Sequence, residues 1–108
     1  MATITLNIPD SMAQFYPKVG DKIFLTALRE SIKQLIKEEQ KNLKKINKRI
    51  RSFEKKYDAE FEKFEKNLPP GGDYQLHEDY GEWSYLVDVA ASVEKNIENY
   101  KKLNGFEQ

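Results

Sequence analysis

The sequence predicts a mainly α-helical fold: a long-helix antiparallel coiled-coil hairpin with one short N-terminal β-strand that pairs intermolecularly. Apolar residues recur at steps of three and four in two long segments, which is the spacing of helices that pack on one another. The first segment has one stutter before Leu43, where the polar Glu39 stands in the seam. Two prolines and two glycines in "NLPPGGD" separate these segments and predict a break at 67–79. A chain of 108 residues can form one core but not two. We therefore expect a single domain, with a strand and dimerisation region at 1–36 and the helical hairpin at 37–108.

The first element is a strand at residues 2–8, "ATITLNI", where polar and apolar residues alternate with the period of a half-buried strand. No other segment has this pattern, and a lone strand leaves a row of unpaired backbone donors and acceptors. The strand must therefore pair with a second chain, which predicts an oligomer or a complex. Pro9 ends the strand, and a short helical turn follows. The two sides of the strand are Thr3, Thr5 and Asn7 against Ile4, Leu6 and Ile8.

The first long helix is expected at 21–57, because Asp21 can cap its N-terminus and no proline interrupts the segment. At a rise of 1.5 Å per residue its length is about 55 Å. Asp58 is the expected N-cap of a short helix at 58–67. The apolar stripe of the long helix contains Leu25, Leu28, Ile32, Ile36, Leu43, Ile46, Ile50, Phe53 and Tyr57.

The second long helix is expected from about 80 to 103, with Asp79 as its N-cap and Glu82 completing a capping box. A stop signal follows at Asn104 or Gly105. Because this helix is the shorter one, it should cover the first helix between about 40 and 65 and leave 23–36 bare. Its apolar stripe contains Trp83, Leu86, Ala90, Val93, Ile97 and Tyr100.

The formal net charge is zero, yet residues 29–57 carry +7 and residues 58–108 carry −7. One interpretation is that the two segments fold together and compensate each other; the other is that the basic helix 41–56 binds a polyanion. Nucleic-acid binding is thus a secondary expectation, either on the basic helix or on the polar side of the strand. The residues concerned are Lys44, Lys45, Lys48 and Arg49, and Thr3, Thr5 and Asn7.

Catalytic and metal sites are not expected. The chain has no cysteine, and its one histidine, His77, stands beside Glu78 and Asp79 where consecutive side chains diverge. No serine or cysteine nucleophile stands near a base, and no glycine-rich loop carries a phosphate-binding lysine. We expect no enzyme activity and no cofactor. No apolar run approaches the length of a membrane span, so a cytoplasmic location is expected.

Two parts of the sequence are expected to contact a protein partner. The first is the uncovered apolar stripe at 23–36, and the second is the acidic, aromatic stretch before and within the second helix, where aromatic residues lie outside the apolar stripe. The expected contact residues are Ile23, Phe24, Leu28, Ile32, Tyr74, His77, Glu78, Asp79, Tyr80 and Tyr85.

As a set, "TITLNIPDS", the long basic helix, "KKYDAEFEKFEKN" and "HEDYGEWSYLVDV" resemble small antitoxins of prokaryotic toxin–antitoxin pairs. This resemblance implies a protein that binds and neutralises a cognate toxin, often a ribonuclease, by occlusion, with autoregulation of its operon. In the ribbon-helix-helix version of this class, Thr3, Thr5 and Asn7 would face the DNA major groove. The sequence departs from that pattern because Pro17 shortens the first helix and the strand has no Arg or Lys. A structural coiled-coil adaptor and a nucleic-acid-binding protein are the alternatives.

Overall fold

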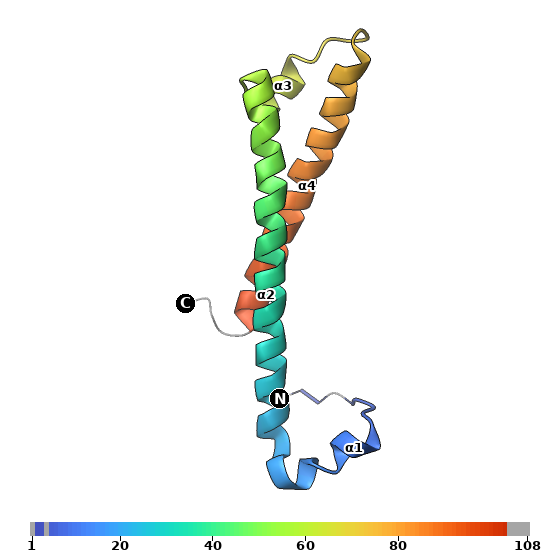
Figure 1. Cartoon of the computed structure of the whole chain (residues 1–108), viewed down its shortest axis with the longest axis vertical. Helices are drawn as coiled ribbons and strands as arrows, with labels where there is room; N and C mark the ends of the chain where they lie inside the picture. Colours follow the sequence, from blue (N-terminus) through green and yellow to red (C-terminus); the bar gives the residue numbers. More distant parts are fainter. Residues whose placement is uncertain (1, 4, 104–108) are drawn as a thin grey trace.

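The computed structural model describes residues 2–3 and 5–103 and forms an elongated rod. Its extents are 68 × 31 × 23 Å, and its radius of gyration is 21.6 Å. A compact chain of this length would have a radius of about 13 Å. The described residues contain four helices: α1 (Asp10–Ala13), α2 (Tyr16–Tyr57), α3 (Phe61–Lys66) and α4 (Tyr74–Leu103) (Figure 1). The prediction of a mainly helical hairpin is therefore confirmed.

The long helix α2 bends near its start, at Gly20. This residue has φ +63°, in the left-handed region that glycine adopts without steric cost. Pro17 lies in the first turn before the bend, where its missing N–H has no helical partner to lose. The straight part of α2 therefore begins at Asp21, as the sequence predicted.

The turn between α2 and α3 is built differently from the prediction. Asp58 is the C-cap of α2 and has φ +50°, and its N–H donates to the Glu54 carbonyl oxygen. Aspartate tolerates this left-handed conformation better than most residues. The prediction that Asp58 caps the next helix is wrong, because the chain first turns and α3 begins at Phe61 after an extended Glu60.

The helix α4 begins at Tyr74, earlier than predicted. The side chain of Asp73 accepts a hydrogen bond from the Gln75 N–H at 2.9 Å, so Asp73 occupies the capping position. Asp79 and Glu82 lie inside the helix, and the predicted capping box is wrong. The sequence signal was ambiguous because acidic residues occur at both positions. The predicted stop at Asn104 or Gly105 lies outside the described residues.

The helices α2 and α4 pack antiparallel around an apolar seam. Ile36 and Ile46 of α2 contact Ala90, Val93 and Ile97 of α4. Nearer the α3 end, α4 leans away from α2 (Figure 1), and aromatic side chains fill the widening space. The cover of α4 therefore extends down to Ile36 rather than stopping near residue 40 as predicted, because α4 keeps its apolar face, with Val93 and Ile97, on α2 toward its C-terminal end.

The predicted strand at 2–8 is not formed: residues 2–3 and 5–9 have no regular structure, and Ile4 lies outside the described residues. The physical reason is that the described residues contain no second strand with which this segment could form backbone hydrogen bonds. None of the described helices has an apolar stretch long enough to cross a lipid bilayer.

Candidate interaction surfaces

One buried carboxylate, that of Asp79, links the two long helices. The residue is 5% exposed. Its Oδ2 accepts hydrogen bonds from the Lys56 ammonium at 2.6 Å and from the Tyr57 hydroxyl, and its Oδ1 accepts from the Gln75 side-chain amide at 2.9 Å. Three donors thus satisfy a charge that would be costly to bury alone.

These hydrogen bonds set the protonation state of Asp79. The Lys56 ammonium, followed by the Tyr57 hydroxyl, lowers the pKa of the Asp79 carboxyl to about 2. Burial and the hydrogen bond to Asp79 raise the pKa of Tyr57. Asp79 was expected to contact a partner, but its carboxylate is turned into the hairpin and fully occupied there.

Around Asp79 an aromatic cluster joins α2, α3 and α4. Trp83 is fully buried, stacks on Phe53 at a centroid distance of 5.5 Å and contacts Phe64 at 4.9 Å. Its indole Nε1 has no hydrogen-bond partner among the described residues. The cluster consists of Phe53, Tyr57, Phe61, Phe64, Tyr80 and Trp83.

Tyr80 belongs to this cluster rather than to an open surface. Its ring stacks on Phe61 at 5.8 Å, and its hydroxyl donates to Glu65 Oε2 at 2.8 Å, which raises the pKa of Tyr80. The sequence could not place Tyr80 here, because the contact depends on how α3 folds back against α4. Tyr80 therefore stabilises the hairpin through its ring.

A second link between the long helices is the pair of Arg49 and Glu82. The guanidinium donates from Nε to Oε2 at 2.6 Å and from Nη2 to Oε1 at 3.0 Å, a two-point geometry specific to arginine. The Arg49 side chain is 52% exposed and that of Glu82 is 43% exposed, so solvent screens the pair. Arg49 was a candidate nucleic-acid contact, but here it is tied to α4.

The remaining predicted residues on α4 form a row on its outer face, which we call the acidic-aromatic row: Tyr74, Glu78 and Tyr85. At about 100° per residue these three positions point in nearly the same direction. Tyr74 is 76% exposed and Tyr85 is 66% exposed, and the Tyr74 hydroxyl donates to Glu78 Oε1 at 2.8 Å. His77 is half-buried, and its Nε2 lies 3.0 Å from the Gly71 carbonyl oxygen, so it holds the preceding loop.

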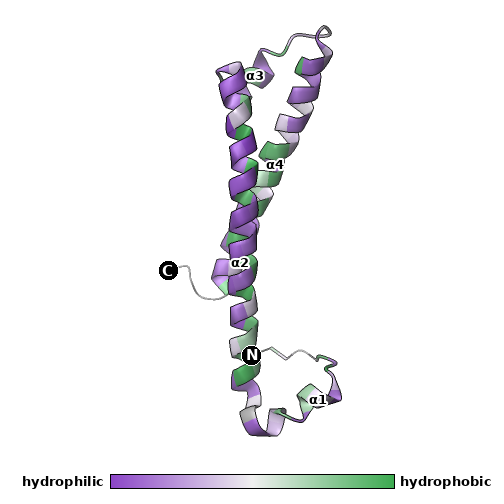
Figure 2. Ribbon diagram, viewed as in Figure 1, coloured by the Kyte–Doolittle hydropathy of each residue, from purple (hydrophilic) through white to green (hydrophobic). Residues whose placement is uncertain are grey.

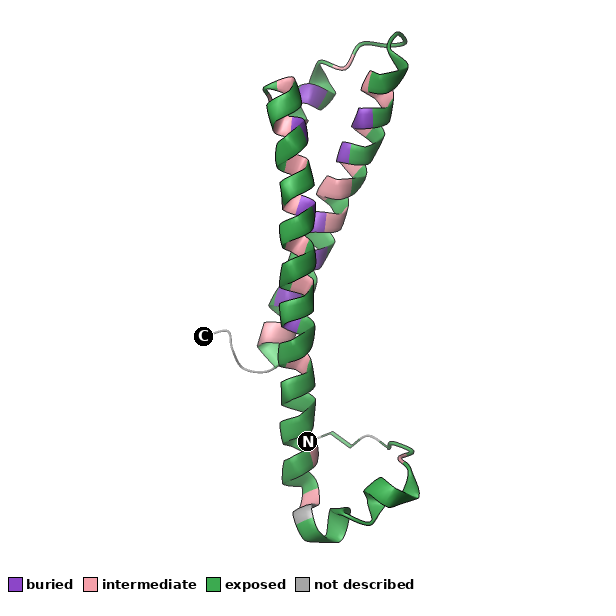
Figure 3. Ribbon diagram, viewed as in Figure 1, coloured by how far each residue is buried: buried purple, intermediate pink, exposed green. Residues whose placement is uncertain are grey.

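Exposed apolar residues are concentrated at the other end of the rod, in residues 5–35, which we call the N-terminal arm. Figure 3 shows that most of the ribbon at this end is exposed. Of the eleven large apolar residues that are exposed in the described part of the chain, eight lie there. Ile23 and Leu28 are exposed, as predicted; Phe24 is half-buried against Tyr16, and Ile32 is half-buried against the seam. The eight are Leu6, Met12, Phe15, Tyr16, Ile23, Leu25, Leu28 and Leu35.

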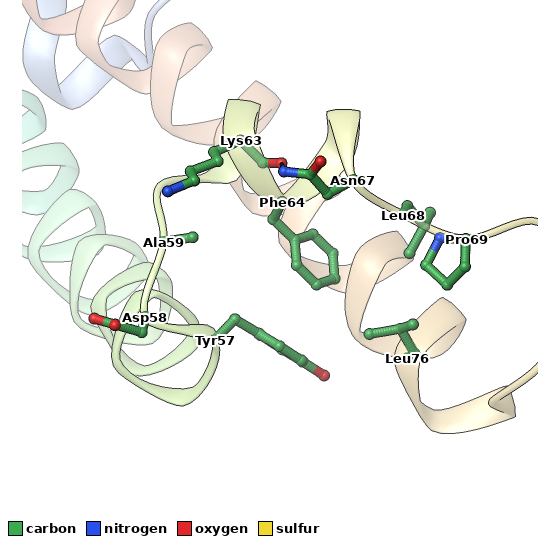
Figure 4. A pocket seen from close by; sticks show the side chains of 9 residues that line it. All are labelled: Tyr57, Asp58, Ala59, Lys63, Phe64, Asn67, Leu68, Pro69 and Leu76. Carbon is green, nitrogen blue, oxygen red and sulfur yellow. Dashed lines mark hydrogen bonds between the residues drawn. The ribbon is translucent and has the colours of Figure 1, made fainter.

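An open hollow of about 390 Å³ lies where α2 turns into α3, a feature without a sequence signal (Figure 4). The Tyr57 and Phe64 rings and the Leu76 side chain line its apolar side, and Lys63 stands at its rim. Its form depends on the turn at Asp58. Across the described parts of the chain, no group of three or more His, Asp or Glu side chains is placed to hold a metal ion.

No protein-family model matches this sequence, and neither a curated protein nor a solved structure is similar to it. The functional argument therefore rests on the geometry of the chain itself.

Proposed function

We propose that this chain is a non-enzymatic protein-binding protein that neutralises a toxin, in the manner of an antitoxin, by covering the toxin's active site. The N-terminal arm is the primary contact, and the hairpin formed by α2, α3 and α4 is the rigid base from which it extends. The observation that carries the proposal is the concentration of exposed apolar side chains in the arm. Such a patch on a soluble chain marks an interaction site.

The arm presents the same face of α2 that α4 covers further along. Leu25 and Leu28 are 52% and 54% exposed, whereas Ile36 and Ile46 on the continuing stripe are 6% and 8% exposed. Fully burying a leucine side chain contributes about 1.5–3 kcal/mol. Several such side chains together can offset the loss of freedom on association, which costs about 4–15 kcal/mol.

The acidic-aromatic row is the proposed second contact. Tyr74 and Tyr85 offer large apolar rings with a polar tip, and Glu78 adds a negative charge between them. A ribonuclease must present a basic surface to its RNA substrate, so an acidic surface on its inhibitor steers and orients the encounter. This charge complementarity favours a toxin of the ribonuclease type.

Co-expression with the product of the adjacent gene tests the proposal. We expect the two proteins to co-purify, the toxicity of the partner to be relieved, and both effects to disappear with L25E and L28E in the arm. The control is L103E, which places the same change on a leucine outside the arm that is even more exposed. Retained binding by the arm variant, or equal loss with the control, would refute the assignment of the arm.

A structural adaptor that assembles with itself is the second candidate. Leu25, Leu28, Ile32 and Leu35 follow the 3-4-3 spacing of a coiled-coil seam, which suits another helix of the same kind. Pairing of two arms would also bring two copies of residues 2–8 together. The predicted intermolecular strand requires this arrangement, and so does recognition of DNA by Thr3, Thr5 and Asn7. Light scattering of the isolated chain separates the two candidates: a stable homodimer abolished by L28E favours the adaptor, and a monomer opposes it.

A further inference from the structure

Six basic residues form a straight stripe along the middle of α2. They recur at steps of four, three, four, three and four, so at about 100° per residue they stay on one face of the helix. All six are exposed, and hydrophilic residues dominate this part of α2 (Figure 2). The stripe extends over eighteen helical steps, about 27 Å at a rise of 1.5 Å per residue. Its members, which we call the basic stripe, are Lys37, Lys41, Lys44, Lys48, Arg51 and Lys55.

The basic stripe lies on the side of α2 that faces away from α4. The seam residues Ile46, Ile50 and Phe53 contact α4, and the stripe is displaced from them by about half a turn of the helix. The basic residues that compensate α4 are others: Arg49 pairs with Glu82, and Lys56 pairs with Asp79.

The structure thus distinguishes basic residues of α2 that pair with α4 from basic residues of α2 that do not, a distinction that the net charge of the segment does not show. Within the described residues, none of the six members of the basic stripe forms an ion pair. The nearby acidic residues of α2 project from other sides of the helix, as their positions in the helical repeat require; they are Glu38, Glu39 and Glu54. The zero net charge of the chain therefore conceals an uncompensated row of positive charge.

We propose that the basic stripe binds the phosphate backbone of duplex DNA. A duplex is a rigid rod of regularly spaced negative charges, which a straight helix can follow along its length. Five of the six groups are lysines, flexible point charges that bind phosphate without the planar, two-point recognition of arginine. The binding is therefore to the backbone and independent of base sequence.

Other polyanions fit this face less well. It carries no aromatic side chain on which single-stranded bases could stack. Membrane binding by a basic helix needs an accessible apolar face beside the charges, but here that face is covered by α4. The wide major groove of B-form DNA admits a helix, whereas the major groove of A-form RNA is too narrow, which favours DNA over duplex RNA.

Fluorescence anisotropy of the full chain with a short labelled DNA duplex tests the proposal. With six phosphates neutralised, the affinity should fall about 10³-fold between about 50 and 200 mM salt. The variant K41Q/K44Q/K48Q should lower the affinity at low salt at least about tenfold and change the slope of log K against log salt from about −5 to about −3. Glutamine has nearly the helix propensity of lysine, and circular dichroism checks that the hairpin remains folded.

The matched control is K63Q/K66Q/K95Q, which removes the same charge from exposed lysines of α3 and α4. It should retain the affinity and the salt slope of the parent chain. The proposal is overturned if the control loses as much affinity as the stripe variant, or if binding does not depend on salt. It is also overturned if a duplex RNA of the same sequence, phosphatidylserine vesicles or polyglutamate binds more tightly than the DNA.

Discussion

The two ends of α2 carry parts of the same apolar stripe, yet these parts have opposite environments. From Ile36 to Tyr57 the stripe is covered by α3 and α4, and Phe53 is only 2% exposed. At Leu25 and Leu28 it is bare, with 52% and 54% of these residues exposed. The difference arises because, among the described residues, α4 covers α2 only as far as Ile36 and Ile32. The hairpin end is completed by the chain itself, whereas the arm presents a surface fit for another molecule.

The hairpin end should respond strongly to a lost core side chain. W83A removes the fully buried centre of the aromatic cluster, and truncation of a buried Trp costs about 3–5 kcal/mol. We expect the urea midpoint, measured by circular dichroism, to fall steeply, with partial unfolding at room temperature.

W83F is the control for that experiment. Because the Trp83 Nε1 has no hydrogen-bond partner among the described residues, replacing the indole with a phenyl ring loses only contact area. We expect W83F to be clearly more stable than W83A. Equal destabilisation by the two substitutions would mean that the indole N–H is engaged in solution.

Loss of the buried Asp79 charge should have the next largest effect on the free energy of unfolding. D79N removes the negative charge that Lys56 and Tyr57 donate to, and hydrogen bonds to a charged group contribute about 1.5–3 kcal/mol. We expect a loss of about 2 kcal/mol in the free energy of unfolding at neutral pH, measured by urea denaturation.

The pH dependence of the same site has a definite sign. The folded pKa of Asp79, about 2, lies below its unfolded value of about 4, so the contribution is complete above pH 4 and is lost as the pH falls toward 2. The parent chain should lose stability in this range, and D79N should lose less. Parallel acid-denaturation curves for the two proteins would contradict the assignment.

The helical hairpin was predictable because its signals are local and repeated. The 3-4 spacing around Ile46 and Val93 and the break at Pro69 place the two long helices without any tertiary information. The sequence could not fix which of two acidic positions caps α4, because Asp73 and Asp79 are both suitable and the choice depends on packing. The division of basic residues between paired Arg49 and the unpaired stripe likewise depends on the rotation of α2 against α4.

Removal of the exposed ion pair between Arg49 and Glu82 should change the free energy of unfolding only slightly. R49Q removes the two hydrogen bonds to Glu82, and exposed pairs contribute about 0.2–1 kcal/mol. We expect a loss in this range at low salt that disappears at high salt, and a double-mutant cycle with E82Q isolates the coupling. A loss that persists at high salt would point instead to the packing of the Arg49 guanidinium over the Phe53 ring, 4.6 Å from its centroid.

The smallest change in stability is expected for substitutions in the arm, and it directly tests whether the arm is less covered than the hairpin end of α2. L25A/L28A truncates two exposed side chains, and surface substitutions change stability by no more than about 0.5 kcal/mol. The same truncation on the covered part of the stripe, I46A, should cost about 2–5 kcal/mol. If L25A/L28A lowers the unfolding midpoint as much as I46A does, the arm is already packed in solution. Repeating the measurement over a range of protein concentrations then identifies the cover: a midpoint that rises with concentration means a second copy of the chain, because association stabilises by mass action.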